Sequence, residues 1–193
     1  MSLDCQVFIL RNPYSETIGD AAFRALLESI IRTRAAEIEE RFGAGEYERN
    51  RMSFTILDPT APREAIADDI VMAVALIGPE ADFFAPNAMA KAFCYRDSGL
   101  EACALINGQN HRLADGSFRF GGAAEVAGTI VGGSGQTELQ DRYQCTVLAA
   151  DFNYRIAMAR KQWEEANGPG RWYASEQVAA KRFKAIVDRA TTA

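Results

Sequence analysis

The segment 118–141, FRFGGAAEVAGTIVGGSGQTELQD, constrains the fold more than any other part of the chain, because it combines glycine pairs with residues that favour strands. Phe118 and Phe120 alternate with polar neighbours, as in a half-buried strand. Gly121-Gly122 suits a tight turn, since glycine adopts positive φ at little cost. The β-branched residues of 126–131 favour a second strand. The segment therefore predicts a hairpin that turns at the first glycine pair.

A glycine-rich junction follows this hairpin. Gly132-Gly133-Ser134-Gly135 ends the second strand, and Thr137 stands three residues before Gln140, which is the pattern of a capping box at a helix start. Such a junction offers backbone N–H groups and the positive end of a helix, and both suit a carboxylate, phosphate or propionate. The alternative interpretation is a turn whose glycines only let a helix pack on a sheet.

Three segments together resemble the GlcG/HbpS family of haem-binding-protein-like domains. GGAAEVAGTIVGGSGQTELQD (121–141) is similar to the closing motif of that family, NAMAKAF (87–93) to its Ala-x-x-Lys-Ala helix, and MSFTILD (52–58) to a strand ending in Asp. The resemblance covers roughly residues 20–160. It implies a profilin-like three-layer α/β/α domain with a central antiparallel sheet, and assembly into oligomers.

Hydrophobic periodicity gives the same α+β class independently. In several segments apolar residues recur at three- and four-residue intervals, which predicts helices. Other segments have the composition of strands, and the connections between paired strands are too short for parallel crossovers. One predicted helix carries an apolar row at Leu139, Tyr143, Val147, Ala150, Tyr154, Ala157 and Met158. The helices are predicted over 20–42, 83–95, 137–167 and 175–190, and the further strands over 52–57 and 70–77.

Size and charge narrow the function classes. The 193 residues suit one domain, with a core over about 20–160 and a helical extension over 171–193. A net charge of -5 argues against a nucleic-acid partner, and no apolar run is long enough for a membrane span. The four cysteines show no metal-binding spacing, so we expect reduced thiols, a cytoplasmic location and no metal site.

Four side chains are candidate catalytic residues. Lys91 interrupts an alanine-rich helix face and matches the lysine of the family, although a surface lysine is the alternative. Asp58 ends a strand beside Pro59, where a turn-forming role competes with a pocket role. Glu125 is expected at the hairpin tip, where a solvated turn residue is the alternative to a general base. His111 lies in a polar loop and is expected to be dispensable. Asp141 in the first turn of its helix is explained by the helix dipole alone.

The resemblance implies a protein that binds a small molecule between the Lys91 helix and the glycine junction. The ligand is then haem, another tetrapyrrole or a small organic acid, and no cofactor is required. The alternative is a cofactor-free isomerase, lyase or hydrolase that uses the four candidate side chains as acids and bases. A homo-oligomer is expected in either case. The predicted ligand-binding residues are Lys91, Gly121, Gly122, Gly132, Gly133, Ser134, Gly135 and Gln136.

Overall fold

A computed structural model of the chain describes residues 3–62, 64–100, 120–168 and 188. The predicted helix over 175–190, the extension over 171–193 and His111 lie outside the described residues, apart from position 188. The elements in chain order are β1 Cys5–Ile9, α1 Asp20–Gly43, β2 Met52–Leu57, α2 Ala67–Ile70, β3 Val71–Ile77, a 3-10 turn η1 Ala81–Phe84, α3 Ala85–Ser98, β4 Ala123–Val126, β5 Thr129–Ser134 and α5 Glu138–Asn167.

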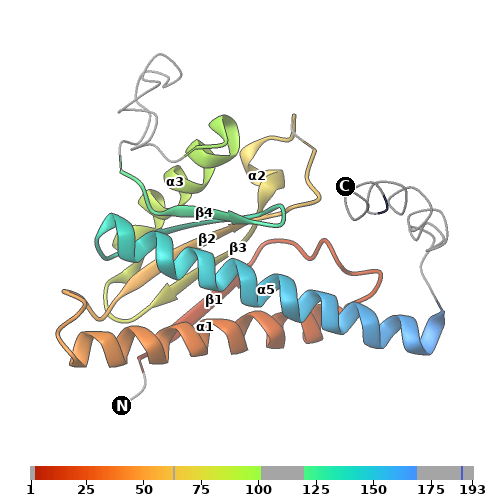
Figure 1. Cartoon of the computed structure of the whole chain (residues 1–193), viewed down its shortest axis with the longest axis horizontal. Helices are drawn as coiled ribbons and strands as arrows, with labels where there is room; N and C mark the ends of the chain where they lie inside the picture. Colours follow the sequence, from red (N-terminus) through yellow and green to blue (C-terminus); the bar gives the residue numbers. More distant parts are fainter. Residues whose placement is uncertain (1–2, 63, 101–119, 169–187, 189–193) are drawn as a thin grey trace.

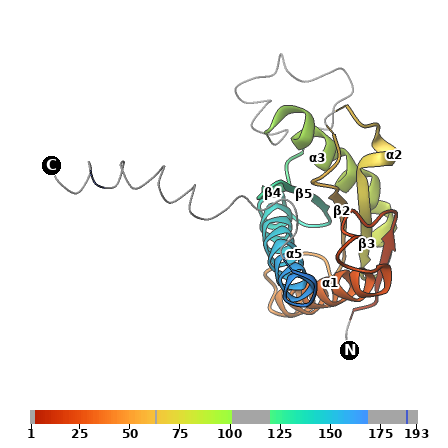
Figure 2. The same ribbon diagram turned by 90° about the vertical axis from the view of Figure 1, so that its right-hand side faces the viewer.

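The five strands form one antiparallel sheet in the order β1-β3-β2-β5-β4, so the predicted α+β class is confirmed. Long helices α1 and α5 cover one face, and α2 and α3 lie on the other (Figures 1 and 2). The main core lies under α1 and α5, where Phe23, Phe54 and Phe152 are completely buried. A smaller cluster around Leu57, Val71 and Ala92 lies under α3. The domain therefore has three layers.

A hairpin is present, but its first strand is β4 and its turn lies later in the sequence than predicted; residues 118 and 119 of the predicted first strand lie outside the described residues. β4 and β5 are joined at Ala127-Gly128, where φ is 46° and 87°, the positive values of a type I′ turn. Gly121-Gly122 instead precedes β4. An Ala-Gly pair is a weaker turn signal than Gly-Gly, and the glycine pair serves a different purpose, because it lies against the first turns of α5.

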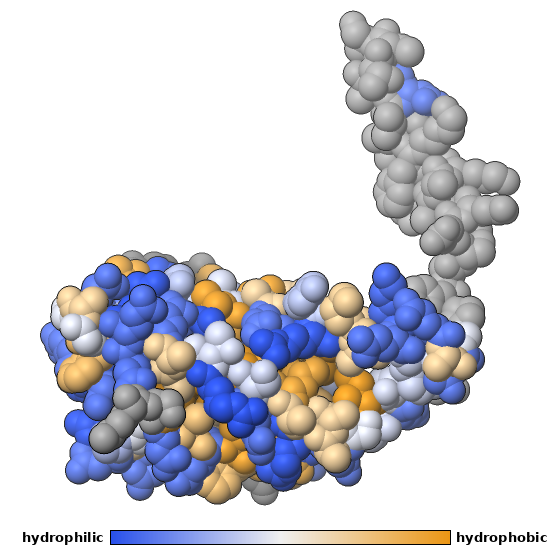
Figure 3. Space-filling view, turned by 90° about the horizontal axis from the view of Figure 1, so that it is seen from below, coloured by the Kyte–Doolittle hydropathy of each residue, from blue (hydrophilic) through white to orange (hydrophobic). Residues whose placement is uncertain are grey.

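The apolar row of α5 faces outward, contrary to the usual expectation for such a row. Leu139 and Tyr154 are 66% and 65% exposed, whereas Gln144, Cys145 and Ala149 on the opposite side are completely buried. Cys145 is a small residue where α5 runs close to the glycine-rich strand β5, as the tight space around Gly133 shows, whereas Leu148 and Phe152 further along the same side fill the main core. Viewed from the α1 side, the surface shows apolar patches between hydrophilic residues (Figure 3). In the described part of the chain, no helix combines the length and apolar character needed to cross a membrane.

Glycines in β5 let a helix approach on each face of the sheet. Neighbouring strand residues point to opposite faces. A Cβ atom on Gly132 would lie 2.1 Å from the carbonyl oxygen of Ala88 in α3, and one on Gly133 would lie 2.5 Å from Sγ of Cys145 in α5. For these two positions, the alternative interpretation of the glycine junction as a packing device is therefore correct.

Gly132→Ala should lower the free energy of unfolding by roughly 1 to 3 kcal/mol, because α3 would have to move away from the sheet. Gly43→Ala is the matched control, since a Cβ atom there meets nothing within 4 Å. Its effect should be neutral or stabilising at the end of α1. Urea denaturation of both variants measures the difference, and equal stabilities would contradict the close packing of α3 on β5.

Candidate functional site

A buried ion pair joins the two helical layers at the end of the sheet where β5 ends and β4 begins. The Lys91 ammonium from α3 lies 2.7 Å from Oδ2 of Asp141 in α5, and the two side chains are 5% and 2% exposed. Lys91 also donates to the carbonyl oxygen of Gly133 at 2.8 Å. Lys91 is therefore neither a surface lysine nor an isolated charge.

Asp141 accepts hydrogen bonds on both carboxylate oxygens. While Oδ2 faces Lys91, Oδ1 accepts the backbone N–H of Gln136 at 2.8 Å. Burial raises the pKa of the Asp141 carboxyl to about 6, although the Lys91 charge and the hydrogen bonds oppose this rise. The dipole interpretation of Asp141 was therefore incomplete, because its main partner comes from a distant helix.

Gly122 provides the space that this ion pair requires. Its φ is 111°, and a Cβ atom there would lie 2.6 Å from Cβ of Asp141 and 3.0 Å from Nζ of Lys91. The carbonyl oxygen of Gly122 accepts the N–H of Gly133 and the thiol of Cys145. Gly122 thus belongs to the wall behind the ion pair.

The backbone N–H groups of the glycine junction are less available than the sequence suggested. The N–H of Gly133 pairs with Gly122, and that of Gln136 pairs with Asp141. The prediction that the groups of Gly133 and Gln136 face an external anion is therefore wrong, because the anion at this helix start is Asp141 itself. The side chain of Gln136 donates to the carbonyl oxygens of Arg49 and Arg51, which fixes the connector before β2.

A cavity of about 340 Å³ opens beside the ion pair. Of the predicted ligand-binding residues, Lys91, Gly121, Ser134, Gly135 and Gln136 line it, whereas Gly122, Gly132 and Gly133 do not. Other lining residues were missed by the sequence reasoning. The described residues that line it are Arg49, Phe84, Asn87, Lys91, Phe120, Gly121, Ser134, Gly135, Gln136, Glu138 and Asp141.

Arg49 is the most important of the missed residues. It lies in the polar connector before β2, where nothing in the local sequence distinguishes it from Arg51. Its Nη1 donates to the carbonyl oxygen of Gly135 at 3.0 Å, and its guanidinium lies 5.9 Å from the centre of the Phe84 ring. The side chain remains 40% exposed. A partly accessible guanidinium therefore lies at the rim of the cavity.

The other candidate catalytic residues are not brought to this cavity. Asp58 follows the far end of β2, where it is buried, pairs with Arg11 at 3.1 Å and accepts two hydrogen bonds from Thr60. Glu125 is exposed in β4 and accepts the N–H of Gly128 in the turn. Both positions agree with the turn-forming alternatives. Among the described residues, no cluster of three His, Cys, Asp or Glu side chains is placed to hold a metal ion.

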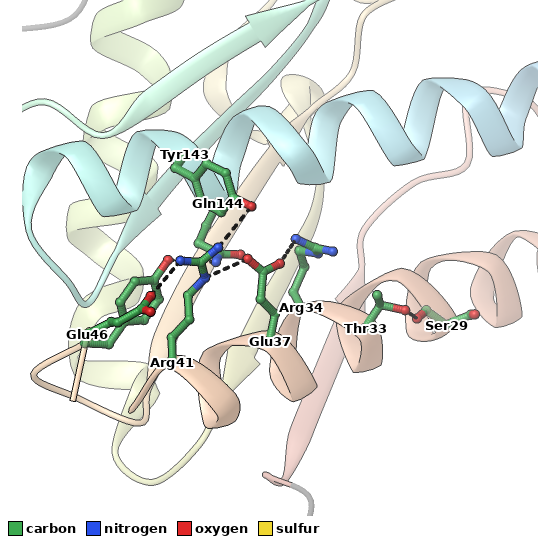
Figure 4. A network of polar contacts seen from close by, with 9 residues as sticks. Ser29, Thr33, Arg34, Glu37, Arg41, Glu46, Tyr143 and Gln144 are labelled. Atoms are coloured by element: carbon green, nitrogen blue, oxygen red, sulfur yellow. Dashed lines mark hydrogen bonds and ion pairs between the residues drawn. The ribbon is translucent and has the colours of Figure 1, made fainter. Parts of the chain in front are cut away.

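A second polar cluster holds the polar connector between α1 and β2 against α1 and α5 (Figure 4). Arg41 donates to Glu37 and Glu46 at 2.8 Å each and to the hydroxyl of Tyr143 at 3.3 Å. Its guanidinium also lies over the rings of Tyr47 and Tyr143. Because the connector leads on to Arg49, this cluster helps to fix the rim of the cavity.

Comparisons of the chain with models of known families, with curated proteins and with solved structures found no match. The resemblance to the GlcG/HbpS family therefore stays a prediction.

The raised pKa of Asp141 gives a signed prediction for stability. In the folded protein the Asp141 carboxyl has a pKa of about 6, whereas its ordinary pKa in an unfolded chain is 3.8. As the pH falls, the folded protein therefore takes up this proton at a higher pH than the unfolded chain does. The contribution of Asp141 to stability should therefore decrease by roughly 1 to 3 kcal/mol as the pH rises from about 4 to about 6. Urea denaturation of wild type and Asp141→Asn across this range tests this: the free energy of unfolding of wild type should fall relative to that of the variant as the pH rises, and a wild type that gains stability relative to the variant would contradict the prediction.

Proposed function

We propose that this protein binds a small organic acid in the cavity beside the Lys91–Asp141 pair. The observation that carries the proposal is this buried pair at the wall of a cavity whose rim bears the accessible guanidinium of Arg49. A volume of about 340 Å³ is near the lower end of the range for small-molecule sites, which is about 300 to 1,000 Å³. The ligand is accordingly a small one.

The lining supports an acid with an apolar body. Arg49 presents a planar donor group that matches a carboxylate, while Phe84 and Phe120 offer ring surface to the rest of the ligand. Lys91 and Asp141 neutralise each other, so Arg49 supplies the charge that selects the anion, and Glu138 opposes a doubly charged one. Protonation of Asp141 would leave the Lys91 charge unbalanced and strengthen anion binding at pH values below about 6.

Haem is less well supported by the same lining. Haem iron is held by His, Cys, Met or Tyr side chains. The described residues that line the cavity include none of these types. The described donor set therefore gives no support to haem ligation, and we propose the organic acid in its place. Cys5, Cys94 and Cys145 form no disulfide, and reduced thiols support a cytoplasmic location as part of the proposal.

Replacement of Arg49 tests the proposal directly. Arg49→Gln should weaken binding of a small carboxylate by about tenfold or more, because a charge-assisted contact is lost. Arg51→Gln is the matched control, since Arg51 also lies over Phe84 but does not line the cavity. Calorimetric titration with acetate, succinate and benzoate gives the affinities. Equal losses in both variants, or no binding of any carboxylate by wild type, would overturn the proposal.

A second candidate function is acid–base catalysis by the same pair. It is favoured by a carboxyl with a pKa of about 6, next to an ammonium group and beside a cavity. In contrast to the set expected from the sequence, Asp58 and Glu125 take no part. If a bound carboxylate is turned over, Asp141→Asn should abolish the reaction and retain binding. Product analysis by chromatography checks this, and undiminished turnover in the variant would exclude the role.

A further inference from the structure

Among the described residues, β1 has a strand partner on one side of its backbone only. It pairs with β3 and forms the edge of the described sheet. The N–H of Leu10 donates to Met72, and the carbonyl oxygen of Asp4 accepts from Gly78, so the even-numbered residues of this segment face β3. In an antiparallel pair the inward and outward groups alternate. Cys5, Val7 and Ile9 therefore direct their N–H and C=O groups away from the sheet.

The residues of β1 themselves lack the charges, proline and bulges that commonly prevent strand pairing. Exposed edge strands are usually blocked by charged residues, proline or bulges. The five residues CQVFI contain no charge and no proline, and their register with β3 is regular. The opposite edge differs, because β4 is shorter and carries Glu125. β1 is thus the open edge of the described sheet.

We propose that two copies of this chain pair their β1 strands antiparallel around a two-fold axis at Val7, which joins the two sheets into one. In this register Val7 lies opposite Val7 of the second copy, and Cys5 lies opposite Ile9. All outward N–H and C=O groups then meet outward groups of the other strand. This dimer proposal does not depend on the proposed ligand site.

The side chains on both faces fit this register. Cys5, Val7 and Ile9 are partly buried and pack against the core under α1, so the pairing extends that core across the two-fold axis. On the other face Gln6 would lie opposite Phe8 of the second copy. Phe8 is 50% exposed, and pairing would cover part of this apolar surface.

Charge favours a second copy in the antiparallel direction. Asp4 precedes the strand, and Arg11 follows it closely. Antiparallel pairing brings the acidic end of each strand next to the basic end of the other, whereas parallel pairing would bring like charges together. Because the strand between Asp4 and Arg11 is uncharged, no like charges lie opposite one another along the paired strands.

Charge substitutions at Gln6 and Phe8 test both the surface and the register. Each is exposed, so the fold should tolerate the change. Gln6→Glu/Phe8→Glu places carboxylates opposite each other, beside the acidic residues Asp4, Glu80 and Asp82 that line the same hollow. Gln6→Lys/Phe8→Glu differs only at position 6 and places opposite charges across the two-fold axis.

Sedimentation velocity at about 5 to 100 μM, the range appropriate for a weak dimer, should show a dimer for wild type and for Gln6→Lys/Phe8→Glu. The double-glutamate variant should be monomeric with an unchanged circular dichroism spectrum. Val7→Pro should also be monomeric, because it removes an outward N–H that makes no bond within the sheet. Monomeric wild type would overturn the proposal, as would a dimer of the double-glutamate variant. Loss of the dimer in both charge variants would overturn the register.

Discussion

The ion pair between Lys91 and Asp141 is the interaction on which the arrangement of the site depends. It joins α3 on one face of the sheet to α5 on the other, and both side chains are almost fully buried. Removing two charges from water costs several kcal/mol per ion, and their attraction offsets this only when further hydrogen bonds satisfy both groups. The carbonyl oxygen of Gly133 and the N–H of Gln136 meet that need. Loss of either partner would leave a buried charge without its counterion.

The glycines of this region follow from the same requirement. The ion pair is short only because both helices lie close to the sheet, and each approach leaves no room for a side chain on the strand. Gly132 admits α3, Gly133 admits α5, and Gly122 leaves space for the ion pair itself. Interiors are packed to the density of organic crystals, so a single added methyl group at these positions would separate layers that the ion pair holds together. The glycines therefore shape the cavity from behind.

The cavity beside the pair combines rigid and accessible parts. Its wall consists of groups that already satisfy one another, whereas Arg49 at the rim keeps part of its surface free. The Arg41 cluster and the side chain of Gln136 fix the connector that carries Arg49. A guanidinium held in this way loses little further freedom when it binds an anion, which favours affinity. This arrangement supports recognition of a small acid more directly than it supports chemistry.

The sequence by itself determined the α+β class and the helices and strands corresponding to α1, β2, β3, α3, β5 and α5, but neither β1 nor α2. Helical periodicity located α1, and β-branched content located β2, because both signals are local. The capping box predicted at Thr137 is present, and it lies at the same end of the sheet as the Lys91 side chain. Only the tertiary structure decided that Asp141 is the partner of Lys91, that Arg49 rather than Arg51 lines the cavity, and that Asp58 and Glu125 lie elsewhere. The reason is physical, since these relations depend on strand order and helix distance, which bring Lys91 to groups 42 and 50 positions away and Arg49 to Gly135, 86 positions away.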